Sequence, residues 1–246
     1  MGFKNKLYIG GEWREASDGG TFEVLNPADE SVITKVSSGT TQDAMACVTA
    51  AEDAFHGWAS LSPRERGEVL RKAYELFMEK IDDIAHLITL ENGKAGGDAI
   101  GEARYAAEFF RWYAEEAVRS DGHLGMAPAT GARILVHQKP AGISVLVTPW
   151  NYPAAMGTRK IGPALAAGCP VIVKPASETP LTMLALMPIL SEAGVPPGVV
   201  NVLPSRSSGA VVSGMLSDPR VRVVSFTGST EVGRKLLHAA ADNIVK

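Results

Sequence analysis

The stretch TPWNYPAAMGTRK, from Thr148 to Lys160, contains side chains that could line a reactive site. It combines a lone amide, Asn151, with an arginine, Arg159, directly after an apolar run. A positioned amide can stabilise negative charge on a reacting oxygen, and a guanidinium can bind a carboxylate through two parallel hydrogen bonds. The stretch contains no cysteine or serine that could attack a substrate. The sequence therefore indicates the wall of a site whose attacking group lies elsewhere.

The elements that must position these residues follow a repeating pattern. Short Val/Ile-rich runs alternate with segments of helical periodicity, which is typical of a parallel sheet covered on both faces. The predicted strands are 142–148, 170–175, 199–204 and 221–228, and the predicted helices are 154–167, 180–193, 207–216 and 229–241. We therefore expect a doubly wound, Rossmann-like α/β fold. Ligands of such sheets bind outside the carboxyl ends of the strands, where this sequence places TPWNYP, KPASETP, LPSRSSG and FTGSTEVG.

Two of these strand ends carry features that suit a nucleotide. Gly228 lies at a strand-to-helix turn and Ser229 opens the next helix, where free N–H groups and the helix dipole favour a phosphate. Its spacing to Gly233 matches neither G-x-G-x-x-G nor a P-loop, so an ordinary capped turn is the alternative. Lys174 ends a buried strand before a proline and would lie near a nucleotide's ribose. The alternative is a lysine in solvent.

The first half of the chain has a different texture. Residues 1–36 read as a small β region, with a Gly-Gly turn in LYIGGEWRE and an Asn-Pro-Ala-Asp turn between two strands. Residues 41–119 are helical, with a Thr-x-Asp cap at Thr41 and one long helix from Ser62 that breaks near Gly93. An extended strand ends at Pro140. We divide the chain into a β and helical part (1–125), an extended strand (126–141) and a Rossmann-like nucleotide-binding core (142–246).

Composition excludes several classes of function. The 246 residues carry a net charge of −3 with a pI near 6.0, which gives no support to nucleic-acid binding. No apolar window reaches the length of a membrane span. Cys47 and Cys169 are too few for a disulfide scaffold and lack metal-ligand spacing, so we expect a cytoplasmic protein without a metal. We expect both thiols to be packed in the core.

Seven motifs together resemble the aldehyde dehydrogenase superfamily over essentially the whole chain, in the family's order and spacing. They are LYIGGEW, NPADESVITKV, LITLENGK, TPWNYP, LAAGCPVIVKPASETP, GVPPGVVNVLP and SFTGSTEVGRKL. Within the family, TPWNYPAAMGTRK and KPASETP are most similar to succinate-semialdehyde dehydrogenases. The resemblance implies an NAD(P)-dependent aldehyde dehydrogenase (EC 1.2.1 type) that oxidises succinic semialdehyde to succinate.

The resemblance also assigns roles around the substrate. Asn151 would donate to the oxyanion of a thiohemiacetal, Arg159 would bind the substrate's far carboxylate, and Tyr152 and Met156 would line the tunnel. The alternatives are an Asn that completes a turn and a helix arginine paired to a nearby acid. The aromatic stripe Tyr105, Phe109, Trp112 and Tyr113 favours core packing, although the family's substrate channel passes that helix.

Coenzyme choice turns on Ser177. NAD-preferring members often carry a glutamate there, which repels a 2′-phosphate, so Ser177 beside Lys174 favours NADP over NAD, while Glu178 opposes this. Trp150 and Pro149 would shape the pyrophosphate and nicotinamide edge, and Val232 would pack on adenine. The full expected coenzyme set is Thr148, Pro149, Trp150, Lys174, Ser177, Gly209, Gly228, Ser229, Val232 and Gly233.

Two parts that the family needs are not found in this sequence. The general-base glutamate, in an E-L-G-G stretch, is expected shortly after Lys246, and the nucleophilic cysteine later still. We therefore expect this chain alone to be inactive and to lack the fifth strand of the sheet. Three hypotheses remain open: an incomplete chain of a homo-oligomeric enzyme (dimer or tetramer), an NAD(P)-binding module without catalysis, and a truncated product without function.

Overall fold

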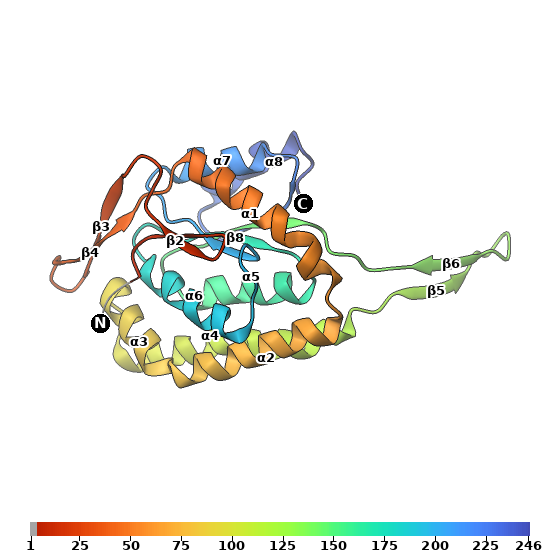
Figure 1. Cartoon of the computed structure of the whole chain (residues 1–246), viewed down its shortest axis with the longest axis horizontal. Coiled ribbons are helices and arrows are strands. Elements are labelled where there is room, and N and C mark those ends of the chain that lie inside the picture. Colours follow the sequence, from red (N-terminus) through yellow and green to blue (C-terminus); the bar gives the residue numbers. More distant parts are fainter. Residues whose placement is uncertain (1–3) are drawn as a thin grey trace.

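A six-stranded sheet lies between two layers of helices in the computed structural model, which describes residues 4–246 (Figure 1). The strand order is β10-β7-β8-β9-β1-β2. Four strands are parallel: β7 (Ile143–Val147), β8 (Val171–Lys174), β9 (Val200–Val202) and β10 (Val221–Phe226). Most of their residues are apolar on both faces, as expected for a sheet with helices on both sides. The predicted α/β fold with a parallel sheet is confirmed.

Each helix layer encloses its own apolar cluster. One layer holds α2 (Pro63–Glu79), α3 (Ile81–Asn92), α4 (Gly96–Glu116), α5 (Ala155–Ala166) and α6 (Leu181–Ala193). The other holds α1 (Thr41–Ser60), α7 (Ser208–Leu216) and α8 (Thr230–Ala241). The four helices that alternate with the parallel strands lie within a residue or so of their predicted ranges.

The first hairpin extends the main sheet, which the sequence did not predict. Strands β1 (Leu7–Ile9) and β2 (Glu12–Arg14) form the expected hairpin around the Gly-Gly turn, and β1 then pairs antiparallel with β9 at Tyr8 and Val202. The Gly10 amide also donates to the Asn201 side chain at 2.9 Å. A second hairpin, β3 (Thr21–Leu25) and β4 (Val32–Ser37), encloses the expected Asn-Pro-Ala-Asp turn. Residues 1–3 of the predicted β region lie outside the described residues.

The helical region departs from prediction in three places. The long helix is interrupted at Lys80, and its continuation α3 ends as expected at Gly93, which has a φ of 76°. Thr40, not Thr41, caps α1 through a reciprocal pair of hydrogen bonds with Asp43. The expectation of core packing for the aromatic stripe is wrong for Tyr105 and Trp112, which are 48% and 64% exposed; Phe109 and Tyr113 are half-buried.

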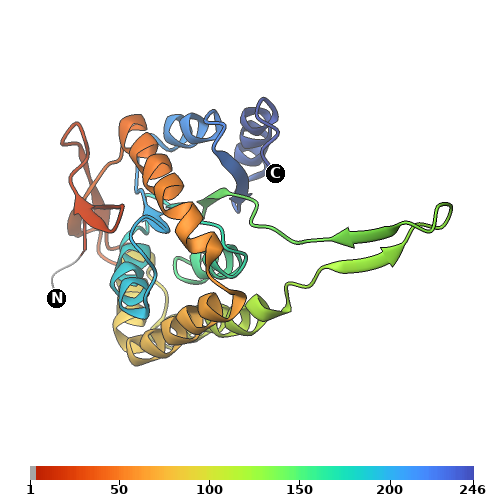
Figure 2. The ribbon, with the colours of Figure 1, turned by 45° about the vertical axis from the view of Figure 1, so that its right-hand side comes forward.

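A two-stranded arm projects from the body of the molecule (Figures 1 and 2). It consists of β5 (His123–Met126) and β6 (Arg133–Val136), which pair with each other and follow a short 3-10 helix, η1 (Ala117–Arg119). The strand expected at 126–141 is therefore shorter and is half of a hairpin. All four residues of β6 are exposed, including Ile134, Leu135 and Val136.

The free edge of β10 is partly covered by the last residue. Lys246 donates to the Arg222 carbonyl at 3.0 Å and accepts from the Val224 amide at 2.8 Å, the hydrogen-bond pattern of a parallel ladder. The division of the chain at residues 125 and 141 stays a prediction.

Candidate functional site

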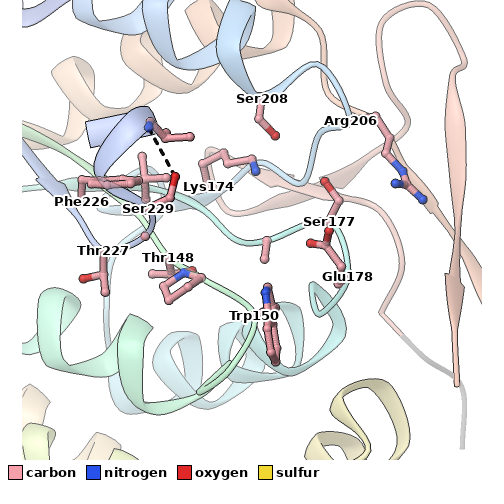
Figure 3. A pocket seen from close by; sticks show the side chains of 15 residues that line it. Thr148, Trp150, Lys174, Ser177, Glu178, Arg206, Ser208, Phe226, Thr227 and Ser229 are labelled. Carbon is pink, nitrogen blue, oxygen red and sulfur yellow. Dashed lines mark hydrogen bonds between the residues drawn. The ribbon is translucent and has the colours of Figure 1, made fainter. Parts of the chain in front are cut away.

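A cavity of about 440 Å³ lies at the carboxyl ends of the parallel strands (Figure 3). Segments that follow β7, β8, β9 and β10 all contribute to its wall, as the doubly wound topology requires. We call it the strand-end pocket. Eight residues of the expected coenzyme set line it: Thr148, Pro149, Trp150, Lys174, Ser177, Gly228, Ser229 and Val232. Gly209 and Gly233 are not in this lining; Gly209 lies in the first turn of α7, and Gly233 packs against Phe226.

Lys174 brings a buried cation to this pocket. The residue is only 5% exposed, and within residues 4–246 its ammonium makes no ion pair or hydrogen bond. Burial lowers the pKa of Lys174 to about 8, and the nearby Glu178 carboxylate opposes this shift. Because most of the side chain is buried while the ammonium borders the pocket without a hydrogen-bond partner in the described residues, this arrangement favours an anionic or oxygen-rich ligand.

The N-terminus of α8 forms another part of the wall. The Ser229 side chain caps the helix by accepting from the Val232 amide at 3.4 Å, while the amides of Thr230 and Glu231 have no acceptor within the helix. A Cβ at Gly228 would lie 2.6 Å from the tip of the Phe226 ring, so a larger residue there would require this ring to move. Free amides and the helix dipole there suit a phosphate group.

Ser177 is held by a structural hydrogen bond. Its hydroxyl donates to the Ser205 carbonyl at 3.0 Å and the residue is almost fully buried. In this rotamer the proton is engaged, so the contribution of Ser177 to coenzyme choice is its lack of a negative charge. Glu178 keeps one carboxylate at the pocket, opposite Lys174.

Sequence reasoning missed several residues of the pocket. Arg206 supplies a second cation and stacks over the Phe22 ring at 5.3 Å, and Ser208, Phe226 and Thr227 complete the wall. Arg206 lies within LPSRSSG, a segment already expected at the carboxyl end of a strand. Its positive charge at that place was the signal that could have marked it as a pocket residue. Trp150, 57% exposed, and the exposed Val232 provide apolar surface at the pocket's rim.

The residues expected around the substrate lie outside this pocket. Asn151 directly follows Trp150 and is exposed, and no hydrogen bond of its side chain is found in the described part of the chain. Tyr152 lines a separate cavity of about 490 Å³ with Lys94 and Tyr105. Asn151 therefore lies in the segment that joins these two cavities.

Arg159 lies in a third place. It borders a cavity of about 540 Å³ together with Lys160. Its guanidinium is 5.8 Å from the centre of the Phe109 ring and contacts the Met156 sulfur at 3.9 Å. Among residues 4–246 it pairs with no carboxylate within 4 Å, so the alternative of a helix arginine paired to an acid finds no support. Lys160 donates to Ser225 at 2.8 Å, and burial, with the adjacent Arg159 charge, lowers the pKa of Lys160 to about 8.

The described residues contain neither a metal-binding cluster nor a membrane-spanning helix. No cluster of three or more His, Cys, Asp or Glu side chains within residues 4–246 is placed to hold a metal ion. No helix in the same range is long and apolar enough to span a membrane.

Comparison with known proteins decides the family. The model described as "Aldehyde dehydrogenase family" matches residues 13–246. The chain belongs to the aldehyde dehydrogenase family. It is 44% identical over 244 residues to the NADP(+) succinate-semialdehyde dehydrogenase of Escherichia coli. The matched region covers 99% of this chain and 50% of that protein. A glutarate-semialdehyde dehydrogenase of Pseudomonas putida is also 44% identical, with 99% and 51% covered.

Solved structures of similar proteins have the same fold. A crystal structure of an E. coli NADP dependent enzyme superposes with a TM-score of 0.97 at 44% identity, covering 99% of this chain and 50% of that one. The structure of PnpE in complex with nicotinamide adenine dinucleotide gives a TM-score of 0.95 at 34% identity, with 99% and 50% covered. The chain thus spans about half the length of the relatives it matches.

Proposed function

We propose that this chain is the coenzyme-binding half of an NAD(P)-dependent aldehyde dehydrogenase. The observation that carries the proposal is the largely buried Lys174, whose ammonium borders a pocket that also contains the N-terminus of α8 and has no hydrogen-bond or ion-pair partner in the described residues. Lys174 would bind ribose oxygens and, where present, a 2′-phosphate, while the α8 amides would bind the pyrophosphate. Ser177 leaves room for the 2′-phosphate of NADP, in agreement with the NADP(+) in the name of the E. coli relative.

We propose succinic semialdehyde as the substrate. Arg159 supports this because its guanidinium has no carboxylate partner in the described residues and lies beside Met156 and Phe109. The far carboxylate of the substrate would then pair with Arg159. Tyr152 and Met156 would line the tunnel that leads to it. Glutarate semialdehyde, the substrate named for the P. putida relative, is one methylene longer and could use the same arginine, so it is the second candidate.

In the proposed reaction the residues of this chain bind the coenzyme and the substrate, and they polarise the aldehyde. Asn151 would donate its amide to the oxyanion that forms when a cysteine attacks the aldehyde. Bound NAD(P)+ supplies the hydride acceptor. The thioester that follows would be hydrolysed by water activated by a glutamate. We propose that this cysteine and glutamate come from sequence outside this chain, because Cys47 and Cys169 are both buried and burial raises the pKa of Cys47.

The arm supports a homo-oligomer as the working form. Leu124, Met126 and Leu135 of strands β5 and β6 are each more than 60% exposed. Pairing with a second copy would remove this apolar surface from water. The two free cysteines are consistent with a reducing compartment, and we propose the cytoplasm, although one relative, at 44% identity, is the human mitochondrial enzyme.

Calorimetric titration of the 246-residue chain with NADP+ and NAD+ tests the coenzyme assignment. We expect saturable binding of both, tighter for NADP+. Tighter binding of NAD+ would contradict the Ser177 argument alone. The absence of binding by either would reject a complete coenzyme site in this chain and leave the alternatives of a non-binding fragment or a site completed by other sequence.

A further inference from the structure

The segment that carries Asn151 is held by side chains from the helical layer. The Trp150 carbonyl accepts from the Asn92 amide at 2.9 Å, and the Asn151 carbonyl accepts from the Lys94 ammonium at 3.0 Å. Asn92 and Lys94 flank Gly93, whose φ of 76° ends α3. This left-handed turn lets two donors, two residues apart, hold two consecutive carbonyls of the segment.

Lys94 is itself held in place by a buried acid. Its ammonium pairs with Glu102 on α4, and the two side chains are 15% and 1% exposed. The ammonium also lies 3.8 Å from the centre of the Tyr152 ring, a cation–π geometry. One lysine therefore contacts the backbone of Asn151 and the side chain of the next residue.

Glu102 holds the far end of the same segment. Its other carboxylate oxygen accepts from the amides of Ala154 and Ala155 at 2.9 and 3.3 Å, at the start of α5. A single carboxylate thus fixes the start of the helix directly and the Asn151 carbonyl through Lys94. Meanwhile the Asn151 side chain makes no hydrogen bond within residues 4–246, which leaves its amide free for an external acceptor.

We propose that Lys94 and Glu102 are positioning residues that orient the Asn151 amide for its role at the oxyanion. The proposal rests on the proposed function. Neither side chain lines the strand-end pocket, so their effect is on the chemical step and not on coenzyme binding. Because the backbone is held on both sides of Asn151, the point from which its side-chain amide reaches an oxyanion is set in advance, and only side-chain rotation remains to be fixed on binding.

Hydrogen exchange on this chain tests the structural part. Lys94→Met should raise exchange of the amides in 150–155 by about tenfold or more, because a buried tether is lost. Lys72→Met is the matched control, since Lys72 also donates to a backbone carbonyl, that of Glu192 at 2.8 Å, but far from this segment. Lys94→Arg should restore protection. Unchanged exchange in Lys94→Met would overturn the proposal while leaving coenzyme binding, and hence the proposed function, intact.

A double-mutant cycle in the full-length enzyme tests the catalytic part. We expect Asn151→Ala to lower kcat by about 100-fold and Lys94→Met by about tenfold, with coenzyme Kd changed less than about twofold. If Lys94 acts through Asn151, adding Lys94→Met to Asn151→Ala should cost less than a further twofold. If instead the two losses of kcat multiply, so that the double variant is about tenfold slower than Asn151→Ala alone, the proposal is overturned. Glu102→Gln, which keeps the oxygen that faces Ala154, repeats the cycle should Lys94→Met not fold. A wild-type enzyme that oxidises no aldehyde would instead refute the proposed function, and the positioning role with it.

Discussion

Coenzyme binding should take up a proton at Lys174. The lysine is buried without a protein partner, and its pKa of about 8 means that half of the free chains carry the charge at pH 8. Phosphate and ribose oxygens of bound coenzyme would favour the charged form. Each binding event at pH 8 should therefore take up about 0.5 proton.

The same pKa sets the pH dependence of affinity. Because the pKa is lowered, the charged form that binds coenzyme predominates below pH 8 and is lost above it. Between pH 7 and pH 9 the charged fraction falls from about 0.9 to about 0.1, so affinity should fall about tenfold, or about 1.4 kcal/mol. Calorimetry at pH 8 in two buffers with different ionisation enthalpies measures the uptake directly. NAD+ serves as ligand first, because it lacks the titrating 2′-phosphate.

A matched pair of variants isolates the lysine. Lys174→Met should abolish the uptake and the pH dependence. Lys160→Met should preserve both, because Lys160 has a similarly lowered pKa but lies outside the strand-end pocket. If the wild-type chain takes up no proton on binding coenzyme, or if Lys174→Met still takes one up, Lys174 is not the group whose protonation is coupled to coenzyme binding.

Three further outcomes are expected. In the full-length enzyme Arg159→Ala should raise KM for succinic semialdehyde by about tenfold or more while changing KM for propanal less than twofold; equal effects in steady-state kinetics would contradict the carboxylate assignment. Ser177→Glu should weaken NADP+ relative to NAD+ by about tenfold in calorimetry, because it places a second carboxylate beside Glu178; an unchanged ratio would show that Ser177 does not set the preference. Leu135→Glu, on the exposed arm, should lower the oligomeric mass measured by light scattering while leaving Tm within about 2 °C; an unchanged mass would exclude β6 from the interface.

The sequence was sufficient for the features that depend on local pattern. Continuous apolar runs and the helical segments between them predicted the parallel strands, and the topology then placed their polar ends together at one pocket. Gly93 was found because a left-handed helix end favours glycine. The interruption at Lys80 was missed, since that residue keeps an ordinary φ of −110° and needs no glycine or proline.

The rest depends on contacts between distant segments. Arg206 reaches the pocket only because the turn after β9 lies beside the turn after β8, where Ser177 donates to Ser205. The exposure of Tyr105 and Trp112 was mispredicted, because helical periodicity alone does not say which side of α4 meets α5. Likewise, the contact between Lys94 and Asn151 joins residues 57 positions apart, beyond what a local pattern can indicate.

The pairing of β1 with β9 has a consequence for biosynthesis. The Gly10–Asn201 hydrogen bond spans 191 residues, so β1 emerges from the ribosome long before β9, the strand it joins. At about 5–20 residues per second, the first hairpin waits roughly 10–40 s with its apolar residues uncovered. Pairing of β1 with β9 is then a late folding event of high contact order.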